Sequence, residues 1–198
     1  MDGSGDERAG PDDGQLVRAT RRGDLGAFEA LVGRYQRQAT AVAFRLLNSR
    51  EDAMDVVQDA FLRAYERLDT LSKPRRFGPW LLRIVSNLSL NFRRARALRR
   101  AEPLQWTDEP DGQHGRTARP DPSAVQPAEE ASAREMSTLL ADAVARLPDR
   151  QRQALVLFAL EQMPQKEIAE MLGCSVEAVK WHVFAARKKL KEQFADYL

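Results

Sequence analysis

Apolar residues recur every three or four positions along most of the chain, which is the spacing of one face of an α-helix. Helical periodicity starts near Gln15 and is broken at Gly23. The first long stripe follows Asp24, a candidate N-cap, and its helix is expected to end at Asn48-Ser49. A second stripe lies within Glu51–Leu68, and a third begins after Pro79. The pattern therefore predicts an all-α protein. The predicted core positions are Phe28, Val32, Tyr35, Ala39, Val42 and Leu46, then Met54, Val57, Phe61, Ala64 and Leu68, then Leu81, Ile84, Val85, Leu88 and Phe92.

The helical pattern stops between residues 101 and 131, which contain five prolines and two glycines. A structureless stretch of this length favours two small helical domains, 15–100 and 132–198, joined by a flexible linker. Such a linker spans roughly 30 Å on average and about 100 Å when stretched. Residues 1–14 are rich in Gly and Asp and are predicted to form a disordered tail.

The second domain is predicted to begin with a helix capped by Ser132, and Pro148 is predicted to open another helix over 149–163. The segment Pro164–Leu190 then reads as two helices joined by a tight turn. Gly173 suits the turn, and Ser175 is a ready N-cap for the second helix. This order of residues predicts a helix-turn-helix, whose second helix enters a DNA major groove. An ordinary helical hairpin with a solvated basic face is the alternative.

The 198-residue chain has a formal net charge of only +2, but the charge is segregated. Between Lys73 and Arg100 there are nine basic residues and no acidic one. A block of one sign favours a phosphate-contacting surface over a solvated helix face, which usually mixes both signs.

Aromatic residues lie beside these cations at Phe77 and Trp80. Arginines that hold phosphates, together with aromatic rings that stack on bases, are what a single-stranded nucleic acid needs. In the other interpretation, the two rings are simple core residues. The helix after Pro79 also carries a polar, cationic stripe made of Arg83, Asn87, Asn91 and Arg94.

Three carboxylates, Asp52, Asp55 and Asp59, are spaced so that they share one face of a helix. Either this is a solvated acidic face, or it is offered to a basic partner. A third interpretation makes them metal ligands of an enzyme that acts on nucleic acid, since hard cations bind carboxylates. They form a single line, however, and no converging ligand is evident.

The remaining chemistry indicated by the sequence is sparse. Cys174 is the only cysteine, so no internal disulfide can form, and an inert, buried thiol is expected there rather than a redox switch. No cofactor, metal site or catalytic residue is expected. No apolar run is long enough to span a membrane and no signal-peptide pattern is present, so a cytoplasmic location is expected.

Both halves resemble the bacterial sigma factors of the extracytoplasmic-function (ECF) type. Gly23–Tyr35, Glu51–Tyr65 and Phe77–Arg94 resemble region 2 of these factors, and Ala145–Leu157 together with the helix-turn-helix resembles region 4. The two sets of motifs, in this order and at this size, are much more specific than either set alone.

The resemblance implies a dissociable, non-enzymatic subunit that binds core RNA polymerase and directs promoter-specific initiation. It also implies a partner that inhibits it, an anti-sigma protein. The acidic helix would dock on core polymerase, the loop and helix after it would open the −10 element and capture single-stranded bases, and the last long helix would read the duplex −35 element. The implied residues are Asp52, Asp55, Gln58 and Asp59 for polymerase; Lys73, Arg75, Arg76, Phe77, Trp80, Arg83, Asn87, Asn91 and Arg94 for the −10 element; and Ser175, Glu177, Lys180, Trp181, Phe184, Arg187 and Lys188 for the −35 element.

Two consequences can be tested. If polymerase holds the two domains apart, the free protein should bind promoter DNA weakly. If the chain is instead a helix-turn-helix regulator of duplex DNA, it should bind an operator without polymerase, and the acidic helix and the aromatic and basic residues of the first domain would have no function.

Overall fold

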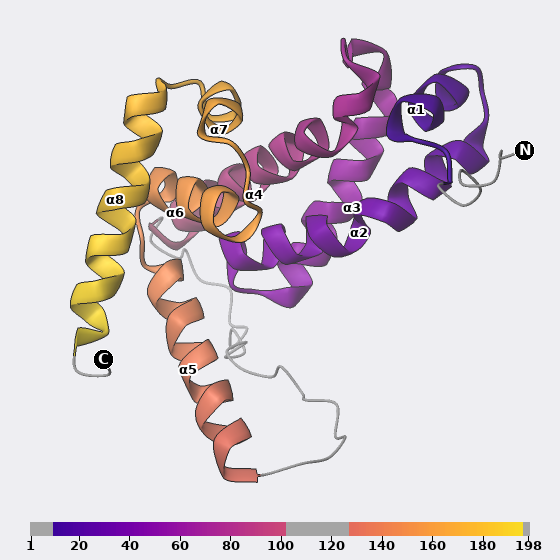
Figure 1. Ribbon diagram of the computed structural model, residues 1–198. Helices are drawn as coiled ribbons and strands as arrows, with labels where there is room; N and C mark the ends of the chain where they lie inside the picture. Colours follow the sequence, from indigo (N-terminus) through magenta and orange to yellow (C-terminus); the bar gives the residue numbers. More distant parts are fainter. Residues whose placement is uncertain (1–9, 102–126, 196–198) are drawn as a thin grey trace, which may run out of the picture.

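The computed structural model describes residues 10–101 and 127–195, and every regular element in these two ranges is helical (Figure 1). The all-α prediction is therefore confirmed for this part of the chain. Residues 102–126 of the predicted linker and residues 1–9 of the predicted tail lie outside the described residues. Residues 127–131, which were assigned to the linker, are already helical.

The first half contains four α-helices and two short 3-10 turns. Its helix ends follow local chemistry: Asp12 forms a capping box with Gln15, and Asp24 accepts a hydrogen bond from the N–H of Ala27 at 3.2 Å. Asn48 ends the second helix in the left-handed region, with a φ of 54°, and Ser49 caps the third. The elements are α1 (Asp13–Arg21), α2 (Leu25–Leu47), α3 (Arg50–Glu66), the turns Leu68–Thr70 and Pro74–Arg76, and α4 (Phe77–Ala101).

The second half begins with α5 (Pro127–Ala145), five residues before the predicted cap at Ser132, because proline is tolerated in the first turn of a helix. The predicted helix over 149–163 is shorter than expected. Regular α-helix ends with α6 (Asp149–Leu155), and a π-helical turn follows at Val156–Leu160, where the N–H of Glu161 bonds to the carbonyl of Val156. The helix-turn-helix is formed by α7 (Gln165–Leu172) and α8 (Val176–Gln193).

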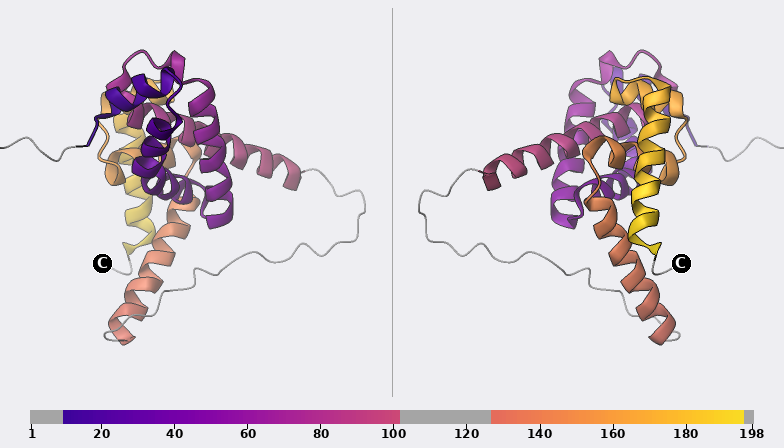
Figure 2. Two further views of the ribbon diagram at one scale, coloured as in Figure 1. Left: turned by 90° about the vertical axis from the view of Figure 1, so that its right-hand side faces the viewer. Right: turned by 90° about the vertical axis from the view of Figure 1, so that its left-hand side faces the viewer.

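The two predicted helical domains are both present, and they pack on each other. In Figure 1, α6 lies beside α2 and α4, α8 forms one edge of the molecule, and α5 projects from the body. The views in Figure 2 show that the C-terminal end of α4 also projects. One continuous cluster of buried apolar side chains runs from Leu46 and Val85 in the first half to Ala154 and Leu157 in the second.

The predicted core of the first half is largely correct, but Met54 is an exception. Its side chain is 57% exposed, whereas Ala53, Val56 and Ala60 of the same helix are buried. The buried face of α3 includes the predicted Val57, Phe61 and Ala64 and extends to the small side chains of Ala53 and Ala60. They also allow close packing of α3 against its neighbours.

The start of α4 is fixed by a close approach between Gly78 and Tyr35 of α2. The ring of Tyr35 packs on Phe77, and its hydroxyl donates a hydrogen bond to Asp13, which also pairs with Arg34. Burial and the Asp13 carboxylate raise the pKa of Tyr35, so the phenol stays protonated. A Cβ added at Gly78 would lie 2.6 Å from Cε1 of this ring.

We expect Gly78→Ala to lower the free energy of unfolding by about 1–3 kcal/mol, because the ring of Tyr35 is held by Asp13 and Phe77 and cannot easily move away. Gly33→Ala is the matched control, since no other side chain or distant backbone atom lies within 4 Å of a Cβ there, and alanine favours helix. Urea unfolding measures both variants. Equal unfolding midpoints for the two variants would contradict the close packing.

Candidate nucleic-acid interface

The helix-turn-helix closes as its sequence predicts. Gly173 adopts a left-handed conformation with a φ of 63° at the end of α7, and the Ser175 hydroxyl accepts a hydrogen bond from the N–H of Ala178 at 3.1 Å. Val179 and Val183 of α8 are buried. The turn at Gly173 and the cap at Ser175, together with the buried Val179 and Val183, determine which side of α8 faces outward.

The outward side of α8 and its N-cap, Ser175, carry every residue that the sequence assigned to duplex DNA. The rings of Trp181 and Phe184 are 58% and 67% exposed, which is unusual for aromatic side chains unless they meet a partner. Two of the cations on this side have contacts within the protein: Arg187 lies over the ring of Phe158 at 5.5 Å, and Lys188 lies 3.9 Å from Glu192. The exposed residues are Ser175, Glu177, Lys180, Trp181, Phe184, Arg187 and Lys188.

His182 lies next to this surface and was not predicted to belong to it. Its ring meets the Trp181 ring edge-on, with the ring centres 5.2 Å apart. Burial, with a smaller effect of the Arg150 charge, lowers the pKa of His182, so the ring stays neutral near neutral pH. A neutral ring here supports Trp181 and adds no cation to the surface.

The predicted stripe along α4 is present as one exposed row. Arg83, Asn87, Asn91 and Arg94 are spaced by four, four and three residues, and all four are exposed. Lys73 and Arg75 extend the basic surface into the loop before α4, where Arg75 lies 3.6 Å from Asp12. The row can offer both charge and amide hydrogen bonds to a strand that lies along α4.

The two aromatic residues beside this row differ from the prediction in part. Phe77 is fully buried, with its ring centre 5.5 Å from that of Tyr35 and 6.0 Å from that of Trp80. In this structure Phe77 is therefore a core residue that supports the loop, and its ring is not available to stack on a base. Trp80 is half-buried and keeps one part of its surface accessible.

Two cations of this surface are paired with carboxylates of the other half, which sequence reasoning missed. Arg76 Nη2 lies 2.6 Å from Oε1 of Glu167 in α7, and Arg94 Nε lies 3.8 Å from Oδ2 of Asp149 in α6. No sequence signal marks these pairs, because the partners are separated by more than 50 residues and come together only through the packing of the halves.

The acidic face of α3 lies on a separate surface. Asp55 and Gln58 are exposed, Asp52 pairs with Arg96 at 2.8 Å, and Asp59 pairs with Arg63 at 3.1 Å. The sequence did not indicate that apolar side chains share this helix surface, but Met54, Leu62 and Tyr65 are exposed there. A face that is both acidic and apolar suits a protein partner.

Neither a metal site nor a membrane span is found in the part of the chain that the structure describes. Among residues 10–101 and 127–195, no group of three or more His, Cys, Asp or Glu side chains is placed to hold a metal ion. None of the helices in these ranges is long and apolar enough to cross a membrane.

Comparisons with known proteins agree with this organisation. Residues 31–99 match the family described as Sigma-70 region 2, and residues 137–190 match Sigma-70, region 4. The ECF RNA polymerase sigma factor SigW of Bacillus subtilis is 30% identical over 183 residues, which are 91% of this chain and 95% of SigW. The RNA polymerase sigma-H factor of Pseudomonas aeruginosa is 31% identical over 187 residues, 94% of this chain and 95% of that protein.

Among solved structures, CnrH in complex with the cytosolic domain of CnrY is similar, with a TM-score of 0.66 and 28% identity. The match covers 93% of this chain and 97% of CnrH. The similarity to SigW and to the sigma-H factor extends over both helical halves, which favours a sigma factor over a helix-turn-helix regulator that acts without polymerase. The chain belongs to the ECF RNA polymerase sigma factors.

Proposed function

We propose that this chain acts as a dissociable subunit of RNA polymerase, that it selects promoters by reading their −10 and −35 elements, and that it traps the melted −10 strand. One observation carries the proposal: a single chain presents an outward-facing recognition helix, α8, and a separate row of cations and amides on α4. A helix-turn-helix regulator that binds only duplex DNA would need the α8 surface but not the row on α4.

Each surface suits a different ligand. The α8 surface, from Ser175 to Lys188, has the position and exposed side chains of a helix that enters a major groove. The α4 row, with Lys73, Arg75 and Arg76 in the loop before it, suits a single strand whose phosphates meet cations while one base meets Trp80. We assign Phe77 a supporting role beneath that loop.

The acidic and apolar face of α3 is assigned to core polymerase. Asp55 and Gln58 lie at its exposed centre, and Asp52 and Asp59 lie beside them. Opposite charges across such a contact would guide the approach and fix the orientation, while exposed Met54 and Leu62 would supply apolar contact area.

In this proposal the chain performs no covalent chemistry, because polymerase makes the RNA. Its contribution is recognition, about 1–3 kcal/mol for each well-read base pair, together with the capture of opened bases. It would act in the cytoplasm, where polymerase and promoter DNA are. Because CnrH was solved with the cytosolic domain of CnrY, we also propose that an inhibitory protein partner binds this chain.

The proposal is tested by run-off transcription on a library of genomic fragments with core polymerase. We expect a defined set of fragments to yield transcripts only when the chain is added, because core polymerase alone does not select promoters. Promoter sequences shared by these fragments would then define the two elements. If no fragment yields a transcript beyond those that core polymerase makes alone, the proposed function is wrong.

Asp55→Lys should weaken association with core polymerase by about tenfold, because it places a cation in the middle of an acidic docking face. The binding is measured by titrating core polymerase into the labelled full-length chain. Glu29→Lys, an equal change of charge at an exposed position of α2, is the control. An unchanged dissociation constant for Asp55→Lys would remove α3 from the polymerase interface.

Lys180→Glu should lower transcription from the selected promoters by about tenfold and should reduce its dependence on the upstream element, because α8 would then repel the DNA it reads. Lys189→Glu makes the same change of charge on the same helix but outside the assigned reading surface. The measurement compares promoters with intact and scrambled upstream elements. Equal losses for both variants on both promoters would mean that Lys180 has no part in recognition.

A further inference from the structure

Helix α1 packs against the loop that joins α3 to α4 and carries three of the cations assigned to the melted strand (Figure 1). Leu16 and Val17 on the apolar side of α1 are buried, which anchors the helix to the body of the first half. The match to Sigma-70 region 2 begins at residue 31 and does not extend to α1. What α1 does is therefore indicated by its contacts with the loop.

Arg21, the last residue of α1, holds the first part of this loop. Its Nη2 donates hydrogen bonds to the carbonyls of Leu68 and Leu71, at 2.7 and 2.6 Å, and its Nε lies 3.6 Å from Oδ1 of Asp69. Leu68 and Leu71 are themselves buried. Hydrogen bonds from a charged donor are stronger than those between neutral groups. A single guanidinium therefore fixes the direction in which the loop leaves α3.

The first turn of α1 holds the second part of the loop at Arg75. The carboxylate of Asp12, the N-cap of α1, lies 3.6 Å from Nε of Arg75. Gly14 is buried against the stem of the same arginine, because a Cβ added there would lie 2.9 Å from Cγ of Arg75. The glycine thus lets α1 approach the loop closely. The stem of Arg75 is held in this way, while its side chain stays 80% exposed.

The same turn of α1 also supports the place where the loop enters α4. Asp13 accepts a hydrogen bond from the hydroxyl of Tyr35, and the ring of Tyr35 packs on Phe77. Phe77 in turn packs on Trp80, with the ring centres 6.0 Å apart. One short helix therefore contacts the beginning of the loop directly, contacts its cation at Arg75, and supports its end through Tyr35.

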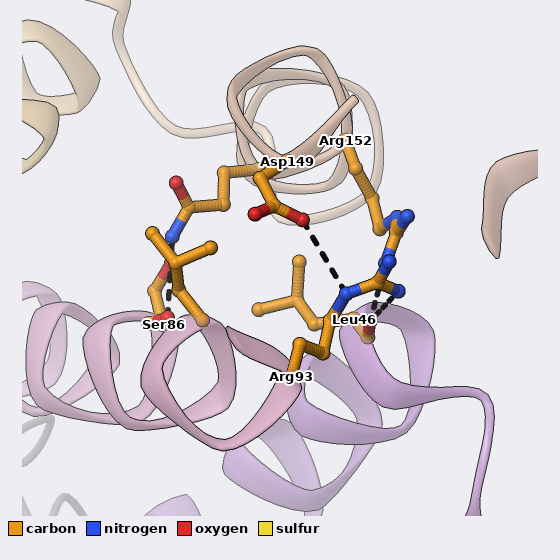
Figure 3. A pocket seen from close by; sticks show the side chains of 7 residues that line it. Leu46, Ser86, Arg93, Asp149 and Arg152 are labelled. Atoms are coloured by element: carbon orange, nitrogen blue, oxygen red, sulfur yellow. Dashed lines mark hydrogen bonds and ion pairs between the residues drawn. The ribbon is translucent and has the colours of Figure 1, made fainter. Parts of the chain in front are cut away.

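These contacts of α1 all lie within the first half. The contact between the halves is centred elsewhere, where Arg152 donates from Nη1 to the carbonyl of Leu46 at 2.9 Å (Figure 3). Beside it, Gln153 donates from Nε2 to Oγ of Ser86 at 3.0 Å. The support that α1 gives to the loop therefore does not depend on where the second half is placed.

We propose that α1 is a positioning element of the strand-capturing site and that Arg21 is a positioning residue. Its guanidinium is occupied by the carbonyls of Leu68 and Leu71, so its effect on the strand passes through the loop. The fixed loop presents Lys73 and Arg75 to the phosphates before the strand arrives, which avoids the cost of ordering the loop on binding. This inference rests on the proposed function, because it takes Lys73 and Arg75 to contact the strand.

The first test measures binding of single strands to the full-length chain without polymerase. The probe is a pool of short, fluorescein-labelled single-stranded oligonucleotides of randomised sequence, and anisotropy is followed at low salt. Arg21→Met keeps an apolar stem and removes every donor. The control, Arg22→Met, removes the same charge from the exposed neighbouring position. We expect Arg21→Met to bind about three- to tenfold more weakly than the control. Arg21→Lys, which keeps donors on one nitrogen, should lie between the two.

The second test separates positioning from direct contact with DNA and from a general loss of stability. Arg21→Met is combined with Lys73→Gln and Arg75→Gln, which remove two cations that the loop presents. In that background we expect Arg21→Met to change the affinity by less than about twofold, because little remains for it to position. An Arg21 that touched the strand itself would give its full loss in both backgrounds.

Hydrogen exchange measured by mass spectrometry reports on the loop itself. We expect the amides of residues 67–76 to exchange faster in Arg21→Met than in Arg22→Met, because the carbonyls that Arg21 holds lose their donor. The amides of α2 should exchange alike in the two variants, which would show that the change is confined to the loop.

Three outcomes would overturn the inference. Equal exchange of the loop in Arg21→Met and Arg22→Met means that Arg21 does not hold it. A faster-exchanging loop with the affinity of the control means that its shape does not matter to the strand. Equal losses with and without the loop cations mean that Arg21 does not act through the loop. In all three the unmodified chain still binds the strand, so the proposed function stands. If the unmodified chain does not bind the pool, strand capture itself is wrong and this inference fails with it.

Discussion

The buried guanidinium of Arg152 ties the end of α5 to the end of α2 and so lies at the centre of the contact between the halves. Among the buried residues of the described chain it is the only charged one, and its hydrogen-bond partners are backbone carbonyls, not carboxylates. These carbonyls lie at or just beyond the C-terminal ends of α5 and α2, where the aligned peptide dipoles place partial negative charge. A single cation thus satisfies two helix ends that would otherwise be buried with unpaired carbonyls.

This arrangement explains why no acidic side chain is needed beside the buried Arg152. Backbone carbonyls at helix ends surround its guanidinium at the centre of the contact between the halves. The acids of the second half, such as Asp149 and Glu167, lie at the edges of this contact. There they pair with arginines of the first half. Two of these arginines, Arg76 and Arg94, are the ones that the proposed function assigns to the melted strand.

The sequence predicted those features that are determined locally. Gly173 and Ser175 define the helix-turn-helix, and spacing along α4 defines its polar row, because each depends on residues within one or two turns of helix. The burial of Phe77 was one of two interpretations that the sequence left open. The exposure of Met54 and the pairing of Arg76 with Glu167 were not predicted, since each depends on which helix packs against which face. The role of Arg152 was missed for the same reason: an arginine between two glutamines gives no sign that the ends of two other helices will converge on it.

The location of the proposed docking face on α3 limits how polymerase could act on the contact between the halves. The acidic face of α3 is not part of the contact between the halves, so polymerase bound there would not displace Arg152 directly. Binding energy can shift the equilibrium only by the difference in affinity for the open and closed states. A further contact is therefore required, one that exists only when the halves are apart. In the proposed function, that contact would hold α7 and α8 at a distance from α4, and it would free Arg76 and Arg94 from Glu167 and Asp149.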